Sequence, residues 1–315
     1  MPLLALLCAM LVQYDDSITV SRSLVSVRVT DVGHKPVPGL TTSDFAARID
    51  RKEAQVLSVR WVASEEEEVH EDTGGRLFVL FVQTDFTRGY RRTAGQMAFR
   101  RYAEQMLASL NPEDRVAVFS FDSHLKLRRD FTTPADASTA IAESLRTDEP
   151  PAPPDQSGVS LTPYLDRTEM KRTSSAEAAM QVVGEALANI EGPKTMIFVG
   201  WGLDAENVRT ELQRWPKGIS ALMDAQVTIF AFNYGGGSSL GNARLEGSTR
   251  TTGGFQAFVS DFPRQGVERF VSASEGHYEL ELRVPPEIQR GDHKLEVTVP
   301  GRNVRVLAPG NIFTN

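Results

Sequence analysis

One stretch of the chain matches a sequence pattern found in serine hydrolases. Gly237-Ser-Ser-Leu-Gly241 fits G-x-S-x-G and would make Ser239 a nucleophile. In hydrolases this motif forms a sharp turn directly between a strand and a helix. Here Asn233-Tyr-Gly-Gly-Gly237 separates it from the preceding apolar run, which indicates a flexible Gly/Ser loop. The later histidines, His277 and His293, fall on or beside expected strands. A secreted serine hydrolase using Ser239 is therefore only an alternative hypothesis.

Composition excludes several other kinds of chemistry. The single Cys can form neither an internal disulfide nor a Cys-based zinc cage, and the five His residues show no metal-ligand spacing. There is no P-loop and no G-x-G-x-x-G motif. The 34 Lys+Arg against 41 Asp+Glu give a net charge of −7, whereas nucleic-acid binding needs a basic face. We therefore expect no nucleic-acid partner and no bound cofactor.

The N-terminus carries the one possible targeting signal. Residues 2–12 are an unbroken apolar run, which is too short to cross a bilayer as a helix. The run has the length of the apolar part of a signal peptide, although no Lys or Arg precedes it. We interpret residues 1–13 as a signal-like segment and expect export to the periplasm or the extracellular space, without an integral membrane span. The alternative is a buried first strand or helix.

The two ends of the chain have the pattern of antiparallel strands. Within the N-terminal segment, residues 14–63, apolar and polar residues alternate over 17–31, and 43–50 and 55–62 read as shorter strands. An acidic stretch ending in Gly-Gly, residues 64–75, is interpreted as a solvated linker. The C-terminal segment, residues 275–315, again has strands of period two. We expect the two end segments to pack together.

The middle of the chain, residues 76–274, follows a different pattern. Apolar runs at 77–82, 115–121, 195–199 and 226–232 are typical of strands buried on both faces. Helical stretches are predicted at 93–110, 134–146, 174–190, 205–224 and 263–274. Strands that alternate with helices predict an α/β fold, a doubly wound and mainly parallel sheet with helices on both faces. With 315 residues and 41% hydrophobic content, the chain is long and apolar enough for such a domain and a second unit.

Three stretches then suggest a family. They are Val25-Ser-Val-Arg-Val-Thr-Asp31 with Lys35-Pro-Val-Pro-Gly-Leu-Thr-Thr-Ser-Asp-Phe45, Leu110-Asn-Pro-Glu-Asp-Arg-Val-Ala-Val-Phe-Ser120, and Thr252-Gly-Gly-Phe-Gln-Ala-Phe258 followed by His277-Tyr278. In this order they resemble the von Willebrand factor A-related proteins that are common in secreted proteomes of Acidobacteria. The resemblance spans nearly the whole chain after residue 20. It implies a von Willebrand A-like domain, Rossmann-like in layout, flanked by β segments.

The resemblance also implies a metal-ion-dependent adhesion site, from which this sequence departs. The family's D-x-S-x-S slot reads Gln83-Thr84-Asp85-Phe86-Thr87, and its later T-D-G reads Gly200-Trp201-Gly202. Two carboxylates are thus replaced, by Gln83 and Trp201. A hard divalent cation needs oxygen ligands, so we expect a degenerate site. Positive charge from Arg88, Arg91 and Arg92 disfavours a cation further.

A displaced metal site is the alternative. Asp85, Thr87, Thr173 and Asp204 could together bind Mg²⁺ or Mn²⁺ and make the chain a metal-dependent adhesion domain. This rearranged site would keep the family's activity with a different ligand set.

Without a metal, the same edge could bind a protein through side chains. Aromatic rings beside arginine are typical of protein contact sites. Trp201 could instead pack against a neighbouring helix. The leading hypothesis is a non-enzymatic exported module that binds another protein, of unidentified nature, through a set of six candidate residues: Gln83, Asp85, Phe86, Arg88, Tyr90 and Trp201.

Overall fold

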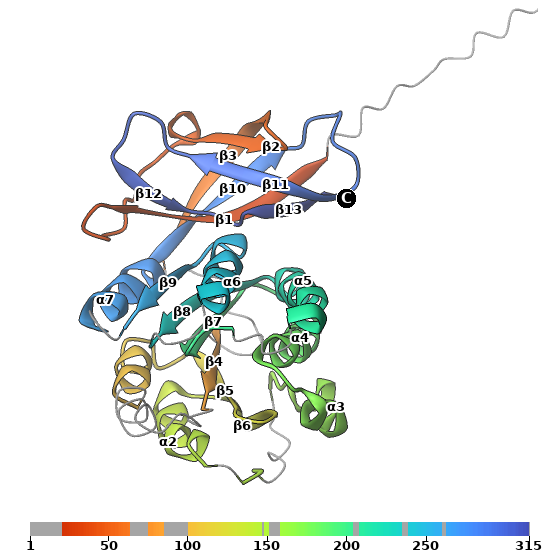
Figure 1. Ribbon diagram of the computed structural model, residues 1–315. Coiled ribbons are helices and arrows are strands. Elements are labelled where there is room, and N and C mark those ends of the chain that lie inside the picture. Colours follow the sequence, from red (N-terminus) through yellow and green to blue (C-terminus); the bar gives the residue numbers. More distant parts are fainter. Residues whose placement is uncertain are drawn as a thin grey trace, which may run out of the picture.

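The computed structural model describes residues 21–63, 75–84, 100–146, 148–150, 158–203, 208–234, 239–259 and 263–314. Figure 1 shows two units, an all-β unit made from both ends of the chain and an α/β unit made from its middle. The signal-like residues 1–13 and the acidic stretch 64–74 lie outside the described residues. Within the described ranges, no helix is long and apolar enough to cross a membrane.

The α/β unit is built on a six-stranded sheet with the order β6-β5-β4-β7-β8-β9. Five strands are parallel, and β6 runs antiparallel to β5 at one edge. The chain enters at the centre with β4, adds β5 and β6 on one side, and then crosses to β7, β8 and β9 on the other. This is the doubly wound order that the alternating pattern predicted. The strands are β4 (Leu77–Gln83), β5 (Arg115–Phe121), β6 (Leu125–Thr132), β7 (Lys194–Gly200), β8 (Val227–Asn233) and β9 (Phe255–Phe258).

Helices cover both faces of this sheet because every central strand is apolar on both sides. Along β4, Leu77, Val79 and Phe81 belong to one buried cluster, and the residues between them belong to another. The helices of the first face are α3 (Arg167–Arg172), α4 (Ala176–Leu187), α5 (Val208–Asp224) and α6 (Ser239–Thr251). The second face is covered by a helical stretch over residues 100–107, α2 (Pro134–Ser144) and α7 (Pro263–Ser274).

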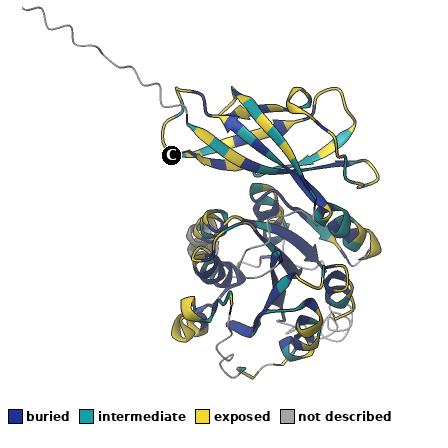
Figure 2. Cartoon of the chain, turned by 180° about the vertical axis from the view of Figure 1, so that it is seen from behind, coloured by how far each residue is buried: buried dark blue, intermediate teal, exposed yellow. Residues whose placement is uncertain are grey.

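The β unit joins strands from both ends of the chain in the order β12-β1-β10-β3-β2-β11-β13, with every pairing antiparallel. The N-terminal strands are β1 (Arg22–Asp31), β2 (Ala46–Ile49) and β3 (Lys52–Ala63). The C-terminal strands are β10 (Gly276–Arg283), β11 (Gly291–Thr298), β12 (Val304–Leu307) and β13 (Asn311–Thr314). Because β1 pairs with β10 and β12, and β2 pairs with β11, neither end forms the sheet alone. Burial alternates along these strands, whereas the central strands of the α/β unit are buried throughout (Figure 2).

Tyr278 ties the two ends together inside the β unit. Its ring lies 5.2 Å from that of Phe45 and 4.8 Å from that of Trp61, measured between centroids. Its hydroxyl donates to the Val37 carbonyl at 2.6 Å and accepts from the Leu40 N–H at 3.0 Å. A C-terminal strand thereby fixes the N-terminal loop before the short 3₁₀ helix η1 (Thr42–Asp44).

The structure corrects one prediction and adds elements that the patterns missed. The stretch predicted as a flexible loop up to residue 241 contains the start of α6 at Ser239. Strands β6, β9 and β13, helix α3 and the 3₁₀ helix η2 (Thr162–Tyr164) were not predicted.

Candidate functional site

The carboxyl ends of the parallel strands gather at one edge of the α/β unit, which we call the carboxyl edge. Strands β4, β7 and β8 end there at Gln83, Gly200 and Asn233. Open α/β sheets bind ligands at this edge, next to the point where the strand order reverses. In this chain the reversal lies between β4 and β7. The two positions where the sequence departs from the adhesion-site pattern therefore stand on neighbouring strands.

Gln83 and Trp201 are hydrogen-bonded to each other across that reversal. The Gln83 Oε1 accepts from the backbone N–H of Trp201 at 2.9 Å, and both residues are only 9% exposed. Gly200 makes this contact possible, because a Cβ there would lie 2.6 Å from Gln83 Oε1 and 2.8 Å from Gln83 Cβ. The Gln83 amide thus binds the backbone directly after the end of the adjacent strand β7.

Trp201 is part of a packed aromatic group. Its ring centroid lies 5.4 Å from that of Tyr234, which lies 6.1 Å from that of Tyr102. Burial raises the pKa of the Tyr234 hydroxyl well above its usual value, so this group stays neutral. In the described structure Trp201 is therefore nearly buried and packs against Tyr234, which directly follows β8.

A short polar network holds the start of α6 against the same edge. Asn233 Nδ2 donates to Asn242 Oδ1 at 2.8 Å, and the Leu203 N–H donates to the Gly241 carbonyl at 3.3 Å. Gly202 has a φ of 105°, and a Cβ there would lie 2.8 Å from Asn242 Oδ1. A residue with a side chain would be strained in this backbone conformation and would push α6 away. Sequence analysis missed Tyr234 and Asn242, whose only signal was their place after a buried strand.

Thr173 stands apart from the reversal point. Its hydroxyl donates to the Met170 carbonyl and accepts from the Leu125 N–H, both at 2.7 Å. It is 4% exposed and caps the end of α3 against the start of β6. Strand β6 is two strands away from β4, so at about 4.8 Å per strand Thr173 lies roughly 10 Å to the side of the Gln83 strand.

A buried ion pair closes the β5–β6 turn at this edge. Lys126 Nζ lies 2.7 and 2.6 Å from the two carboxylate oxygens of Asp122, and Lys126 is buried. Burial raises the pKa of the Asp122 carboxyl, but hydrogen bonds from Lys126 and Ser123 outweigh it, so the pKa is lowered overall. Asp122 is ionised and neutralised by its own neighbour, and sequence analysis did not consider it.

The remaining candidate residues lie outside the described part of the chain. These are Asp85, Phe86, Thr87, Arg88, Tyr90 and Asp204. Among the residues that the structure does describe, no three His, Cys, Asp or Glu side chains are grouped closely enough to hold a metal ion. Ser239 is the first residue of α6 at the carboxyl edge. His277 lies on β10 and lines a cleft together with Lys194 and Val227, which stand at the opposite ends of β7 and β8.

No protein-family model matches the chain, and a search of curated proteins gave no match. Among solved structures, a von Willebrand factor type A protein from Catenulispora acidiphila is similar at 10% identity and a TM-score of 0.47, over 94% of this chain and 74% of that one. The human COPII-coat protein Sec24c is similar at 11% identity and a TM-score of 0.42, over 76% and 43%.

A third similar structure is proximal thread matrix protein 1 from the mussel byssus, described with a zinc-occupied MIDAS motif. It is 14% identical with a TM-score of 0.43, over 72% of this chain and 50% of that one. This chain therefore spans half or less of the length of the coat and byssus proteins. At this level of likeness neither a family nor an activity follows for this chain.

Proposed function

We propose that this chain is a non-enzymatic, exported protein-binding module whose von Willebrand A-like unit recognises its partner at the carboxyl edge without a metal ion. One observation carries the proposal: the hydrogen bond between Gln83 Oε1 and the Trp201 N–H. It joins the two positions at which the family's adhesion site would have carboxylates, and neither of these residues supplies one.

The electrostatics of this pair disfavour a divalent cation. Mg²⁺ takes near-octahedral oxygen ligands and is held in proteins mainly by carboxylates. The Gln83 oxygen is neutral and already accepts a backbone N–H, and an indole has no oxygen to offer. The hydrogen bond between the two residues stabilises the edge. Because neither residue carries a carboxylate, no cation is required to neutralise negative charge between them.

The rearranged metal site is the second hypothesis, and the position of Thr173 supports it poorly. Its hydroxyl already makes two hydrogen bonds at the start of β6. Asp204 itself lies outside the described residues. To serve as a ligand, the Thr173 oxygen would have to approach an ion to about 2.1 Å while it keeps or gives up these two hydrogen bonds.

Neither His277 nor His293 lies next to the start of α6 in the part of the chain that the structure describes. Ser239 follows the carboxyl end of β8, whereas His277 lies near the amino end of the same strand. Seven residues of strand separate these ends by about 20 Å. His293 belongs to the β unit, where its Nδ1 lies 2.7 Å from Asp50 Oδ2.

The proposed contact surface is the segment that follows β4. Asp85, Phe86, Arg88 and Tyr90 combine aromatic rings with a guanidinium, the side chains that contribute most to protein contacts. Gln83 ends the strand that leads into this segment and is joined to the Trp201 backbone by its side-chain oxygen.

A photo-crosslinking experiment tests the contact surface. The full chain would carry a photoreactive phenylalanine at position 90 and be irradiated with extract of the producing cell, and the captured protein would be purified. Its binding should persist in EDTA and fall at least tenfold in a Phe86→Ala, Arg88→Ala variant, because hot-spot truncations each cost about 1–2 kcal/mol or more. Arg302→Ala, at an exposed arginine of the β unit, is the control and should bind normally. Binding that EDTA abolishes and Mn²⁺ restores would favour the metal-dependent alternative instead.

Export is a separate part of the proposal. Production in a bacterial host with residues 1–13 present should place the chain outside the cytoplasm, and a Leu4→Arg, Leu7→Arg variant should retain it inside. A mature N-terminus determined on the exported chain would locate the cleavage point.

A further inference from the structure

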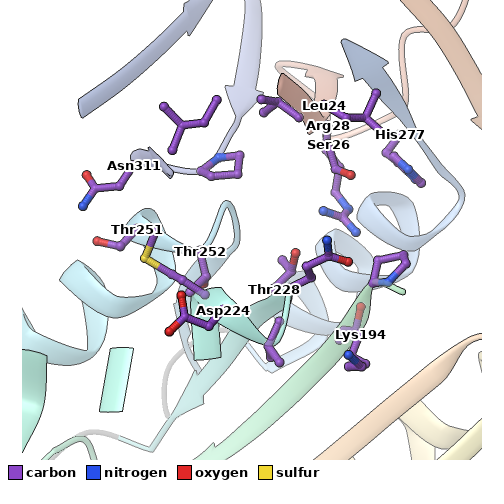
Figure 3. Close-up of a pocket in the computed structure, with 18 of the residues that line it drawn as sticks. Leu24, Ser26, Arg28, Lys194, Asp224, Thr228, Thr251, Thr252, His277 and Asn311 are labelled. Atoms are coloured by element: carbon purple, nitrogen blue, oxygen red, sulfur yellow. The ribbon is translucent and has the colours of Figure 1, made fainter. Parts of the chain in front are cut away.

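A cleft of about 930 Å³ lies between the two units, at the end of the parallel sheet opposite the carboxyl edge. Strands β1, β10 and β13 of the β unit form one wall (Figure 3). The other wall is formed by the amino ends of β4, β7 and β8 and by the end of α5. Neither the family resemblance nor the proposed partner contact involves this cleft.

One edge of β1 is open where it borders the cleft. Residues Arg22–Val27 pair with β10 on one side, but β12 covers the other side only from Arg28 to Asp31. The Ser21 carbonyl accepts from the Val284 N–H, next to β10, and hydrogen-bonding groups alternate sides along a strand. The backbone N–H and C=O groups of Leu24 and Ser26 therefore point to the open side.

Strand β13 presents a second edge to the same space. It pairs with β11 on one side, and the Gly310 carbonyl accepts from the Leu295 N–H on that side. By the same alternation, Asn311 and Phe313 direct their backbone groups away from β11. Strand β13 approaches β1 at only a few residues, and no pairing joins the two strands in the described sheet. Leu24 and Phe313 are exposed by 68% and 50%, which is unusual for large apolar side chains beside a cleft.

The charges around the cleft show what kind of side chain it accepts. Its cations already have partners: Arg22 binds Glu281, Arg28 donates to the Ala273 carbonyl, and Arg76 binds Asp114. Lys194 Nζ donates to the Ile190 and Ala225 carbonyls.

Two carboxylates lack such partners. Asp224, at the end of α5, and Asp292, on β11, both line the cleft and are exposed. Within the described residues neither forms a salt bridge. Burial, followed by the negative charge of Asp292, raises the pKa of the Asp224 carboxyl, so the two groups repel each other across the junction of the units.

We propose that the cleft binds an extended peptide segment of a partner protein, which adds as a strand to the open edge of β1 and places a lysine or arginine side chain between Asp224 and Asp292. Strand addition satisfies the backbone groups of Leu24 and Ser26, and main-chain hydrogen bonds of this kind supply affinity for many peptide-binding domains. The basic side chain removes the repulsion between two carboxylates, one from each unit. Five residues of open edge, Arg22 to Ser26, match a segment of about five residues, or roughly 17 Å.

Hydrogen exchange tests the open edge without any ligand. In the free chain, the amides of Leu24 and Ser26 should exchange at least tenfold faster than those of Val25 and Val27, which face β10. Equal protection of all four amides would overturn the proposal, because the edge would then already be covered.

Displayed heptapeptide libraries test the ligand. Three libraries, random except for a central Lys, Gln or Glu, are selected on the full chain. Peptides from the Lys library should be enriched at least tenfold over the other two. The enrichment should disappear in the Leu24→Pro variant, because proline lacks the backbone N–H that residue 24 directs to the open side of β1. It should persist in the Leu24→Thr variant, which keeps that N–H.

A second variant guards against misfolding of Leu24→Pro. The double variant Asp224→Asn, Asp292→Asn changes two exposed positions. This variant should bind the peptides more weakly and should no longer prefer the Lys library over the Gln library. Three outcomes of the selection would overturn the proposal: no enrichment, enrichment that the Leu24→Pro variant retains, or a preference for Glu. A dimer of the wild-type chain that is lost in the Leu24→Pro variant would also overturn it, because the edge of β1 would then bind a second copy of the chain. Arg88→Ala should not affect any of these results, so failure here is distinguishable from failure of the carboxyl-edge proposal.

Discussion

The side-chain oxygen of Gln83 accepts a hydrogen bond from the backbone N–H of Trp201 at 2.9 Å, across the two strands between which the sheet reverses its order. Both residues are nearly buried, and Gly200 leaves just enough room for the amide. The two strand ends next to the reversal are thus joined by a neutral hydrogen bond within the chain.

Removing that bond should destabilise the α/β unit. Gln83→Leu leaves the Trp201 N–H buried without an acceptor, which costs about 1–3 kcal/mol. Urea unfolding at pH 7 measures the loss. Gln55→Leu, at an exposed position of β3, is the matched control and should change stability by less than about 0.5 kcal/mol. Equal stability of the two variants would show that the Gln83–Trp201 bond is not formed in solution.

Asp130 should be a large contributor to the stability of the loop before η2. Its buried carboxylate accepts from the Ser160 and Thr162 hydroxyls, both at 2.6 Å, and from the Leu161 N–H at 3.0 Å. Asp130→Asn replaces one acceptor oxygen by a donor, so we expect a loss of about 2–3 kcal/mol at pH 7. Urea titrations of both proteins measure it.

The pH dependence of that difference has a definite sign. Burial raises the pKa of Asp130, but the hydrogen bonds from Leu161, Ser160 and Thr162 outweigh it and hold the pKa below its usual value of 3.8. The wild-type advantage should therefore be complete above pH 4 and disappear only as the pH falls through the lowered pKa. A difference that shrinks already between pH 7 and 5 would contradict this account.

The Tyr278 hydroxyl should hold the two chain ends together. Tyr278→Phe keeps the ring contacts with Phe45 and Trp61 but leaves the Leu40 N–H and the Val37 carbonyl without this partner. We expect a loss of about 1–2 kcal/mol in the β unit. Calorimetry measures it, and Tyr164→Phe, at an exposed site, is the control. Unchanged unfolding of both variants would argue against the link.

Mild acid should weaken the junction between the units through His277. Burial, and then the charges of Arg28, Arg60 and Arg76, lower the pKa of His277 from 6.5 to about 3. Below pH 6.5 the unfolded chain takes up a proton that the folded chain does not, so stability falls as the pH drops from 6.5 towards 3. By pH 4.5 this loss reaches about 2.7 kcal/mol. His277→Gln should lack it, and identical pH profiles of unfolding would contradict the prediction.

The layout of the chain could be predicted from its sequence because the apolar patterns are strong. Residues 77–82 are apolar throughout and residues 116–119 form a second apolar run, and these stretches lie in β4 and β5 of the parallel sheet. Residues 17–31 alternate, and the described part of this run forms β1, with one face buried. In both cases the hydrophobic pattern of the sequence agrees with the burial of the strand, so the pattern alone indicates whether one face or both faces of the strand are buried.

Strand β6 could not be predicted because its charges are buried. Lys126, Arg128 and Asp130 are each at most 5% exposed. Their partners are Asp122 in the preceding turn, the Ser120 hydroxyl on β5, and the Ser160–Thr162 loop. The sequence pattern does not show that the β5–β6 turn and the later loop will bring these partners together around one strand.

Helix α6 was missed for a related reason. Its sequence is rich in Gly, Ser and Thr, which are poor helix formers. Tertiary contacts stabilise it instead, with Leu245 fully buried and Asn242 hydrogen-bonded to Asn233.

The position of the candidate site could be predicted from the places where the apolar strands end. The hydrogen bond between Gln83 and Trp201 could not, because it depends on how the residues of β4 and β7 are aligned with each other.

Calorimetric titration of the full chain with Mn²⁺ after chelation tests the central claim most directly. The account predicts no binding heat up to millimolar Mn²⁺, in the wild type and equally in Asp85→Ala and Asp204→Ala. Stoichiometric binding to the wild type that either substitution abolishes would contradict it and establish an adhesion-type metal site at the carboxyl edge.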